Sequence, residues 1–148
     1  MSPKNHLAAL AAFACLASAS VAVLADDHAY TEGQVVNVAR IRTVDGKFDE
    51  YMNWLGTKWK QQQESGKKAG NIVSYAVYHV QPRDAQDADL LLVTTYKNWA
   101  ALDGALAKGD AMAKEVNGSV AASNQAQFER AKIRTVIGSE NIQELLLK

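Results

Sequence analysis

Between residues 35 and 148, branched and aromatic side chains gather in four short runs. The runs cover residues 35–44, 72–80, 90–96 and 142–147. This composition is typical of β-strands in a folded domain. Asp45-Gly46 ends the first run, and a polar loop at residues 81–89 separates the second run from the third. The pattern therefore predicts four strands, of which the middle two follow each other directly.

Between the first two runs, apolar residues recur at the spacing of an amphipathic helix. The stripe that this helix should bury consists of Phe48, Tyr51, Met52, Leu55, Trp59 and Gln62. Gly70-Asn71 is a suitable end for the helix.

A second helical region follows the third run. Asn98 is a good N-cap, and the apolar stripe behind it begins with Trp99, Leu102 and Leu106. Three glycines should divide this region into shorter helices: Gly104, Gly109 and Gly118. The resulting order is β-α-β-β-α-β, which predicts an α+β, ferredoxin-like fold. In that fold an antiparallel four-stranded sheet carries its helices on one face.

The predicted strands are apolar on both faces, although one layer of helices can cover only one. In the first strand Val36 and Val38 share a face with Arg40 and Arg42, while Val35, Asn37, Ala39 and Ile41 share the other. The run at residues 90–96 is nearly continuous in apolar character, as in a strand buried on both sides. The face without helices needs another partner, and we expect a second copy of the chain to supply it in a homodimer.

The first 25 residues have the features of a cleavable signal peptide. Lys4 precedes an uncharged run of small and apolar residues at 7–25, and Val23-Leu24-Ala25 is a suitable cleavage site, with the cut after Ala25. An uncleaved membrane anchor is the alternative, but the run is rich in alanine and only weakly apolar. We therefore expect a periplasmic or secreted protein with no membrane contact after cleavage, a flexible lead-in at residues 26–34 and a single domain at residues 35–148.

Composition narrows the function classes further. The chain has 16 basic and 16 acidic residues and no cluster of lysine and arginine, which argues against nucleic acid as a partner. Its one cysteine, Cys15, lies within the leader, so the mature domain has no thiol for catalysis or for metal binding. We expect no metal and no cofactor.

The order of elements, together with the junction Leu92-Val93-Thr94-Thr95-Tyr96-Lys97-Asn98-Trp99, resembles the dimeric α+β barrel superfamily. The chain is most similar to its antibiotic-biosynthesis-monooxygenase-like group and to the uncharacterised secreted relatives of that group. The resemblance implies two protomers that pack sheet against sheet. It also suggests haem degradation as an activity to consider, which in this group uses an Asn on the first strand and a Trp and a His on the second helix. The matching positions here hold Ala39, Ala105 and Glu115, so the resemblance does not extend to that activity.

A few polar and aromatic residues are candidates for chemistry. His79, the one histidine inside the predicted domain, is the candidate general base, although a lone histidine at a strand end is more often structural. Arg40 and Arg42 should contact the partner protomer, with Glu144 as a possible ion-pair partner, or bind an anion. The ligand pocket should lie between the sheet and the helices, lined by Asn37, Tyr51, Trp54, Tyr75 and Trp99.

Three functions are consistent with this pattern. The first is an exported dimeric barrel that binds a small apolar or aromatic ligand between its sheet and its helices, and this is the function that we favour. The second is a cofactor-free monooxygenase or isomerase that acts on a small aromatic or polyketide-like compound. The third is a structural dimer without a ligand. A ligand-binding barrel must contain a cavity, whereas a structural dimer need not. An oxygenase or isomerase also requires a titratable group inside that cavity.

Overall fold

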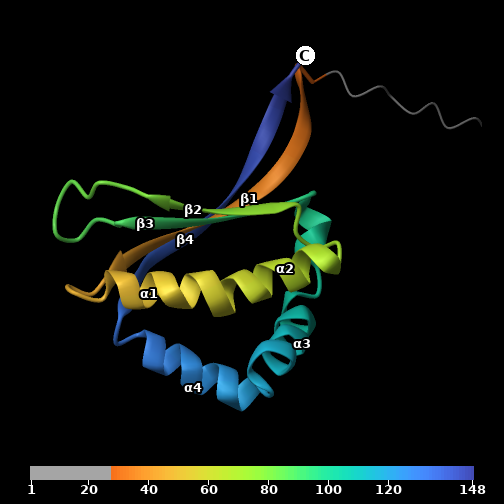
Figure 1. Cartoon of the computed structure of the whole chain (residues 1–148). Helices are drawn as coiled ribbons and strands as arrows, with labels where there is room; N and C mark the ends of the chain where they lie inside the picture. The colour runs from red at the N-terminus through yellow and green to blue at the C-terminus, as the bar shows by residue number, and fades with distance from the viewer. Residues whose placement is uncertain (1–27) are drawn as a thin grey trace, which may run out of the picture.

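The computed structural model describes residues 28–148, so the predicted signal peptide lies outside the described residues. The chain has an α+β fold built on one four-stranded antiparallel sheet (Figure 1). Its strands are β1 (Tyr30–Thr43), β2 (Ser74–His79), β3 (Leu90–Tyr96) and β4 (Arg134–Leu147). They lie in the order β2-β3-β1-β4, and every neighbouring pair is antiparallel.

One long helical run connects β1 to β2. It consists of α1 (Phe48–Trp54), the π-helical turn η1 (Leu55–Trp59) and α2 (Lys60–Lys68). Tyr51, Leu55 and Trp59 pack into the core against Ile41, Leu90 and Leu92 of the sheet, as the stripe predicts. Burying each large apolar side chain of this kind contributes about 1.5–3 kcal/mol.

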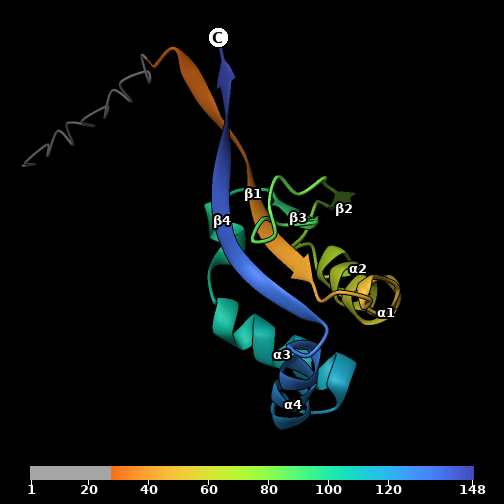
Figure 2. The same ribbon diagram turned by 90° about the vertical axis from the view of Figure 1, so that its left-hand side faces the viewer.

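Between β3 and β4 the chain forms a short 3₁₀ turn and two helices: η2 (Trp99–Leu102), α3 (Ala105–Asn117) and α4 (Val120–Arg130). The Asn98 side chain accepts a hydrogen bond from the Ala101 N–H and caps η2, as predicted. Gly104 and Gly118 interrupt the region with φ angles of 68° and 82°, whereas Gly109 lies inside α3. No residue of α4 is buried, and α4 lies farther from the strands than α1 does (Figures 1 and 2).

The first and the last strand along the chain, β1 and β4, are longer than predicted. Residues 30–34 belong to β1, and residues 30–32 pair with the end of β4, with Tyr30 opposite Leu147 and Glu32 opposite Leu145. The expected flexible lead-in is therefore wrong for these residues, because β4 supplies partners for their backbone groups. Together the two strand ends form an arm that extends beyond the rest of the sheet (Figures 1 and 2).

The helices cover only one face of the sheet. That face carries Ile41, Leu90 and Leu92, all buried. No described element covers the opposite face, whose apolar members are Val36, Val38, Ala76, Tyr78, Leu91, Val93 and Ile142. Tyr78 and Ile142 are 54% and 51% exposed on this uncovered face. No helix among residues 28–148 combines the length and the apolar character that crossing a bilayer requires.

Candidate functional site

An aromatic pair on α1 is the centre of the first candidate site. The rings of Tyr51 and Trp54 stack with centroids 5.6 Å apart and an angle of 8° between their planes. Tyr51 is fully buried in the core, while Trp54 is half-buried at the edge of the stripe. Three residues apart on a helix, the two side chains share one face, which makes this stack possible.

Two arginines from the end of α4 and the start of β4 close over this pair. The Arg130 guanidinium carbon lies 4.3 Å from the Trp54 ring centroid, and that of Arg134 lies 6.0 Å from the Tyr51 centroid. Such contacts are favourable because the face of an aromatic ring attracts a cation. Residues more than 70 positions apart in the sequence thus form one cluster, which we call the arginine–aromatic cluster: Tyr51, Trp54, Arg130 and Arg134.

The charges of this cluster are poorly compensated. Burial lowers the pKa of Arg130, and the nearby positive charge of Arg134 lowers it further. Burial also raises the pKa of Tyr51, although Arg134 and Arg130 act in the opposite direction. The Nε atoms of both arginines are buried without a hydrogen-bond partner. Among residues 28–148 neither guanidinium forms an ion pair with a carboxylate.

Beside the cluster is a hollow of about 570 Å³ between the α1–η1 run and α4, the α1–α4 cleft. Four basic side chains line it: Lys47, Lys58, Arg130 and Lys132. Its two acidic side chains are already paired, Glu50 with Lys47 at 2.8 Å and Glu129 with Lys132 at 2.5 Å. Because both carboxylates are paired, Lys58 and Arg130 leave the α1–α4 cleft with a surplus of positive charge.

A second hollow, the α2–α3 cleft, has a volume of about 360 Å³ and a different character. Small residues on its walls leave the space open: Gly66, Ala69, Ala101, Ala105 and Gly109. The larger apolar walls are Ile72, Tyr96, Leu102 and Met112. Three of its polar side chains have partners, since Ser65 donates to Glu115 at 2.7 Å and Lys108 donates to the Ala101 carbonyl at 2.8 Å. A ligand here would therefore meet mainly apolar surface.

The structure separates the residues predicted to line a single pocket. Tyr51 and Trp54 lie together, but Asn37 lies on the sheet, where it donates to Ser139 at 3.0 Å and to Asn141 at 2.8 Å. Trp99 lies in η2 and donates to Gln143 at 3.0 Å. None of these four lines the α2–α3 cleft.

Tyr75, the fifth predicted pocket residue, lies on β2 and contacts α2. Its hydroxyl donates to Glu64 at 2.6 Å, and this hydrogen bond is the main reason why its pKa is raised. The Tyr75 ring also meets the Trp59 ring edge-on at 5.3 Å. These contacts fix the ring at the edge of the core and outside both clefts.

His79, the candidate general base, lies at the exposed end of β2. Its ring meets the Phe48 ring edge-on at a centroid distance of 5.5 Å. It lines neither the α2–α3 cleft nor the α1–α4 cleft. Within residues 28–148, no group of three or more His, Cys, Asp or Glu side chains is placed to hold a metal ion.

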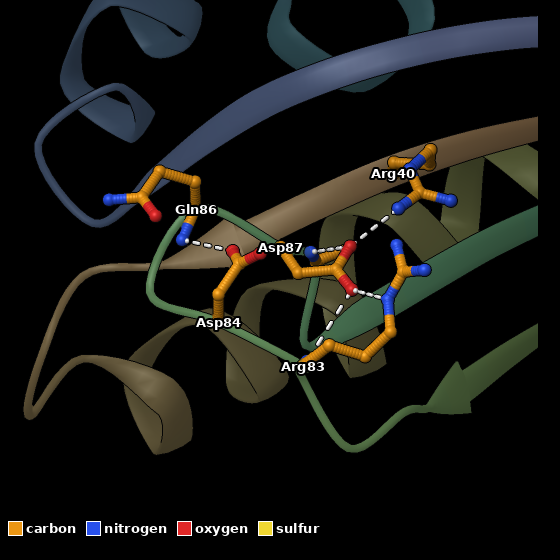
Figure 3. A network of polar contacts seen from close by, with 6 residues as sticks. Arg40, Arg83, Asp84, Gln86 and Asp87 are labelled. Carbon is orange, nitrogen blue, oxygen red and sulfur yellow. Dashed lines mark hydrogen bonds and ion pairs between the residues drawn. The ribbon is translucent and has the colours of Figure 1, made fainter.

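Arg40 finds its carboxylate within its own chain, in the loop between β2 and β3 (Figure 3). Its Nη2 donates to Asp87 Oδ1 at 2.6 Å, and Arg83 Nε donates to Asp87 Oδ2 at 2.9 Å. The Arg83 hydrogen bond and the Ala88 N–H lower the pKa of Asp87 to about 2. Arg42 lies on the same face of β1 as Arg40 and is half-buried.

Neither the arginine–aromatic cluster nor the walls of the α2–α3 cleft were predicted from the sequence. Arg130 and Arg134 flank the last turn before β4, a place where basic residues are ordinary. The sequence holds a partial signal for the arginine–aromatic cluster: Arg130 and Arg134 stand four residues apart, and Trp54 stands at the edge of the apolar stripe. Neither pattern identifies the partner, since the contacts join segments distant in the sequence.

No family model matches this chain, and no curated protein matches its sequence. Among solved structures, the chain is similar to protein SO0527 from Shewanella oneidensis. The two are 12% identical and superpose with a TM-score of 0.49, over 79% of this chain and 96% of that one.

Proposed function

We propose that this protein is an exported, homodimeric α+β barrel of the antibiotic-biosynthesis-monooxygenase-like group that binds a small apolar or aromatic molecule in the α2–α3 cleft. The strand order β2-β3-β1-β4 and the helical connections between β1 and β2 and between β3 and β4 support a ferredoxin-like topology. The signal-peptide features of residues 1–25 support export.

The α2–α3 cleft carries the proposal for ligand binding. Small-molecule sites are concave and mainly apolar and have volumes of about 300–1,000 Å³. The cleft has that character, and its volume of about 360 Å³ suits a molecule of two or three rings. Ser65 and Lys108 in its lining already have partners in the chain, so an apolar ligand would not deprive these two side chains of their hydrogen bonds.

A neutral fluorescent probe, N-phenyl-1-naphthylamine, tests this proposal. We expect the probe to bind with a saturable increase in fluorescence. Ala105→Phe fills the cleft and should abolish the increase, whereas Ala107→Phe, on the same helix but outside the lining, should preserve it. No increase with the unmodified protein, or the same increase with Ala105→Phe, would contradict the proposal and favour a structural dimer without a ligand.

The uncovered sheet face supports the homodimer. It carries Val38 and Val93 at its centre, with Tyr78 and Ile142 toward its edges. A second copy packed on this face would remove the apolar side chains of both copies from water. Arg40, paired with Asp87 at 2.6 Å, brings no unpaired charge to such an interface.

The oxygenase or isomerase alternative gains no specific support at His79. A general base must come within hydrogen-bond reach of the proton that it removes. His79 lines neither cleft and packs against Phe48 instead, so we take ligand binding as the proposed function.

A further inference from the structure

We propose that Arg130 and Arg134 form a binding site for a small oxyanion, a carboxylate or a phosphate, at the α1–α4 cleft. This site is separate from the apolar α2–α3 cleft, because the two share no lining residue. Its chemistry is also different, since it depends on charge rather than on apolar surface.

The first reason is that two like charges lie close together without a counter-charge. The guanidinium groups of Arg130 and Arg134 lie over neighbouring rings, Trp54 and Tyr51, whose centroids are 5.6 Å apart. Among residues 28–148 no carboxylate pairs with either group. Half-buried, uncompensated charges are costly, so an anion that neutralises them would be stabilised here.

The second reason is that the available carboxylates are occupied. Glu50 and Glu129 line the cleft, but Lys47 and Lys132 hold them at 2.8 Å and 2.5 Å. Lys58, the remaining lysine of the lining, has one hydrogen bond within residues 28–148, to the Val116 carbonyl at 3.4 Å. The cleft therefore offers two cationic groups to an incoming anion, Lys58 and Arg130, and the charge of Arg134 acts on Arg130 from nearby.

The third reason is the hydrogen-bonding capacity that the chain leaves unused. The Nε atoms of Arg130 and Arg134 are both buried without an acceptor. A guanidinium forms charge-assisted hydrogen bonds with carboxylate and phosphate oxygens, so an oxyanion would supply both an acceptor and a negative charge. The rings of Trp54 and Tyr51 hold the guanidinium groups in place and reduce the entropy that binding would cost.

Thermal unfolding with added anions tests the site. The protein is titrated with sodium phosphate or with sodium benzoate at an ionic strength kept constant with sodium chloride, and Tm is recorded. We expect a saturable rise in Tm, because a ligand that binds only the folded state stabilises it. A response to phosphate alone indicates a phosphoryl ligand, and a response to benzoate indicates a carboxylate; either supports the site.

Variants connect the response to the arginines. Arg130→Gln and Arg134→Gln should each weaken the apparent affinity by about tenfold or more, because each loses a charge-assisted hydrogen bond. Arg83→Gln removes an exposed guanidinium in the β2–β3 loop and should leave the affinity unchanged. Ala105→Phe, which fills the other cleft, should also retain the response, so the two proposals can fail separately.

Arg130→Met keeps the test decisive if Arg134→Gln does not fold. Methionine still covers Trp54 but removes one of the repelling charges. In chloride alone, this variant should be at least as stable as the unmodified protein, and it should not respond to phosphate or benzoate. The proposal would be overturned if Tm of the unmodified protein did not rise with phosphate or benzoate, or if sodium chloride alone gave the same rise. It would also be overturned if Arg130→Met responded to these anions as fully as the unmodified protein.

Discussion

The phenol ring of Tyr51 joins the core of the protein to the arginine–aromatic cluster. It is the largest of the fully buried side chains, it packs with Leu55 and Leu90, and it stacks on Trp54. Removing a side chain of this kind leaves a cavity in addition to the lost transfer free energy.

We expect Tyr51→Ala to lower the free energy of unfolding by about 3–5 kcal/mol. Leu106→Ala is the control, because Leu106 is 81% exposed, and it should change stability by less than about 0.5 kcal/mol. Urea unfolding measures both values. Similar losses in the two variants would show that the core is not centred on Tyr51.

Asp87 makes the stability of the folded chain depend on pH. Its side chain is 12% exposed, and its pKa is lowered from 3.8 to about 2, mainly by the Arg83 hydrogen bond. A folded-state pKa below the unfolded value stabilises the protein above the unfolded pKa. That contribution is lost as the pH falls from about 4 to about 2.

Asp87→Asn should therefore reduce stability at neutral pH and lose less of it on acidification. Urea midpoints of both proteins, measured at neutral pH and near pH 2, give the comparison. The difference between the two midpoints should shrink as the pH falls through this interval. A difference that stays constant would assign the effect of the variant to packing rather than to charge.

At the scale of residues, the sequence predicted which helix residues are buried, because helical periodicity determines which side chains share a face. Tyr51, Leu55 and Trp59 of the stripe are buried as expected, and Asn98 caps η2, whereas Phe48, also expected to be buried, is exposed. Contacts between distant segments were not predictable, because periodicity does not tell which residue faces a given side chain. Thus Arg40 pairs with Asp87, and Arg130 covers Trp54, neither of which spacing could show.

Two glycines of the α1–η1–α2 run differ in what surrounds them. A Cβ at Gly56, in the π-helical turn, would meet no atom within 4 Å. A Cβ at Gly66, in α2, would lie 2.5 Å from Ile72 Cδ1 and 3.0 Å from Ile72 Cγ1. The same substitution should therefore have opposite effects at the two positions.

We expect Gly56→Ala to stabilise the protein by about 0.5–1 kcal/mol, the usual gain within a helix. Gly66→Ala should instead destabilise it by about 1–3 kcal/mol, because the new methyl group displaces Ile72. Gly109→Ala, inside α3 and equally open, is a second site for the gain. Equal effects at Gly56 and Gly66, measured by urea unfolding, would contradict this reasoning.

Element types and their order followed from the sequence, but element lengths did not. The glycines at 104 and 118 do interrupt the second helical region. β1 and β4 extend well beyond their apolar runs, because each supplies hydrogen-bond partners to the other even where the side chains are polar. The π-helical turn at Leu55–Trp59 was not predicted. The apolar stripe does not reveal it, because Leu55 and Trp59 still lie in the core.

At the scale of the whole molecule, the uncovered sheet face leads to the prediction of a dimer. Val38 lies at the centre of this face and would be buried between two copies. A charge placed there would lose its hydration on association, at a cost of several kcal/mol. The same charge costs less in a monomer, where this face is open to water and only the like charge of Glu140, opposite position 38, opposes it.

Val38→Glu should therefore sediment as a monomer at micromolar concentration, while the unmodified protein and Ala121→Glu sediment as dimers. Ala121 is an exposed residue of α4, far from the uncovered face, which makes it a matched control for added charge. A monomeric unmodified protein, or a dimeric Val38→Glu, would exclude an interface centred on this face.

The arm formed by β1 and β4 brings the two ends of the described chain together. The Lys148 N–H donates to the Ala29 carbonyl at 2.9 Å. A circular permutant is therefore feasible, in which a short Gly-Ser linker joins residue 148 to residue 28 and the new ends open between Gly118 and Ser119. Because every strand pairing survives this rearrangement, the permutant should give the far-ultraviolet circular dichroism of the native sequence. The continuity of the backbone from α3 to α4 would then be dispensable, while the adjacency of β1 and β4 would not.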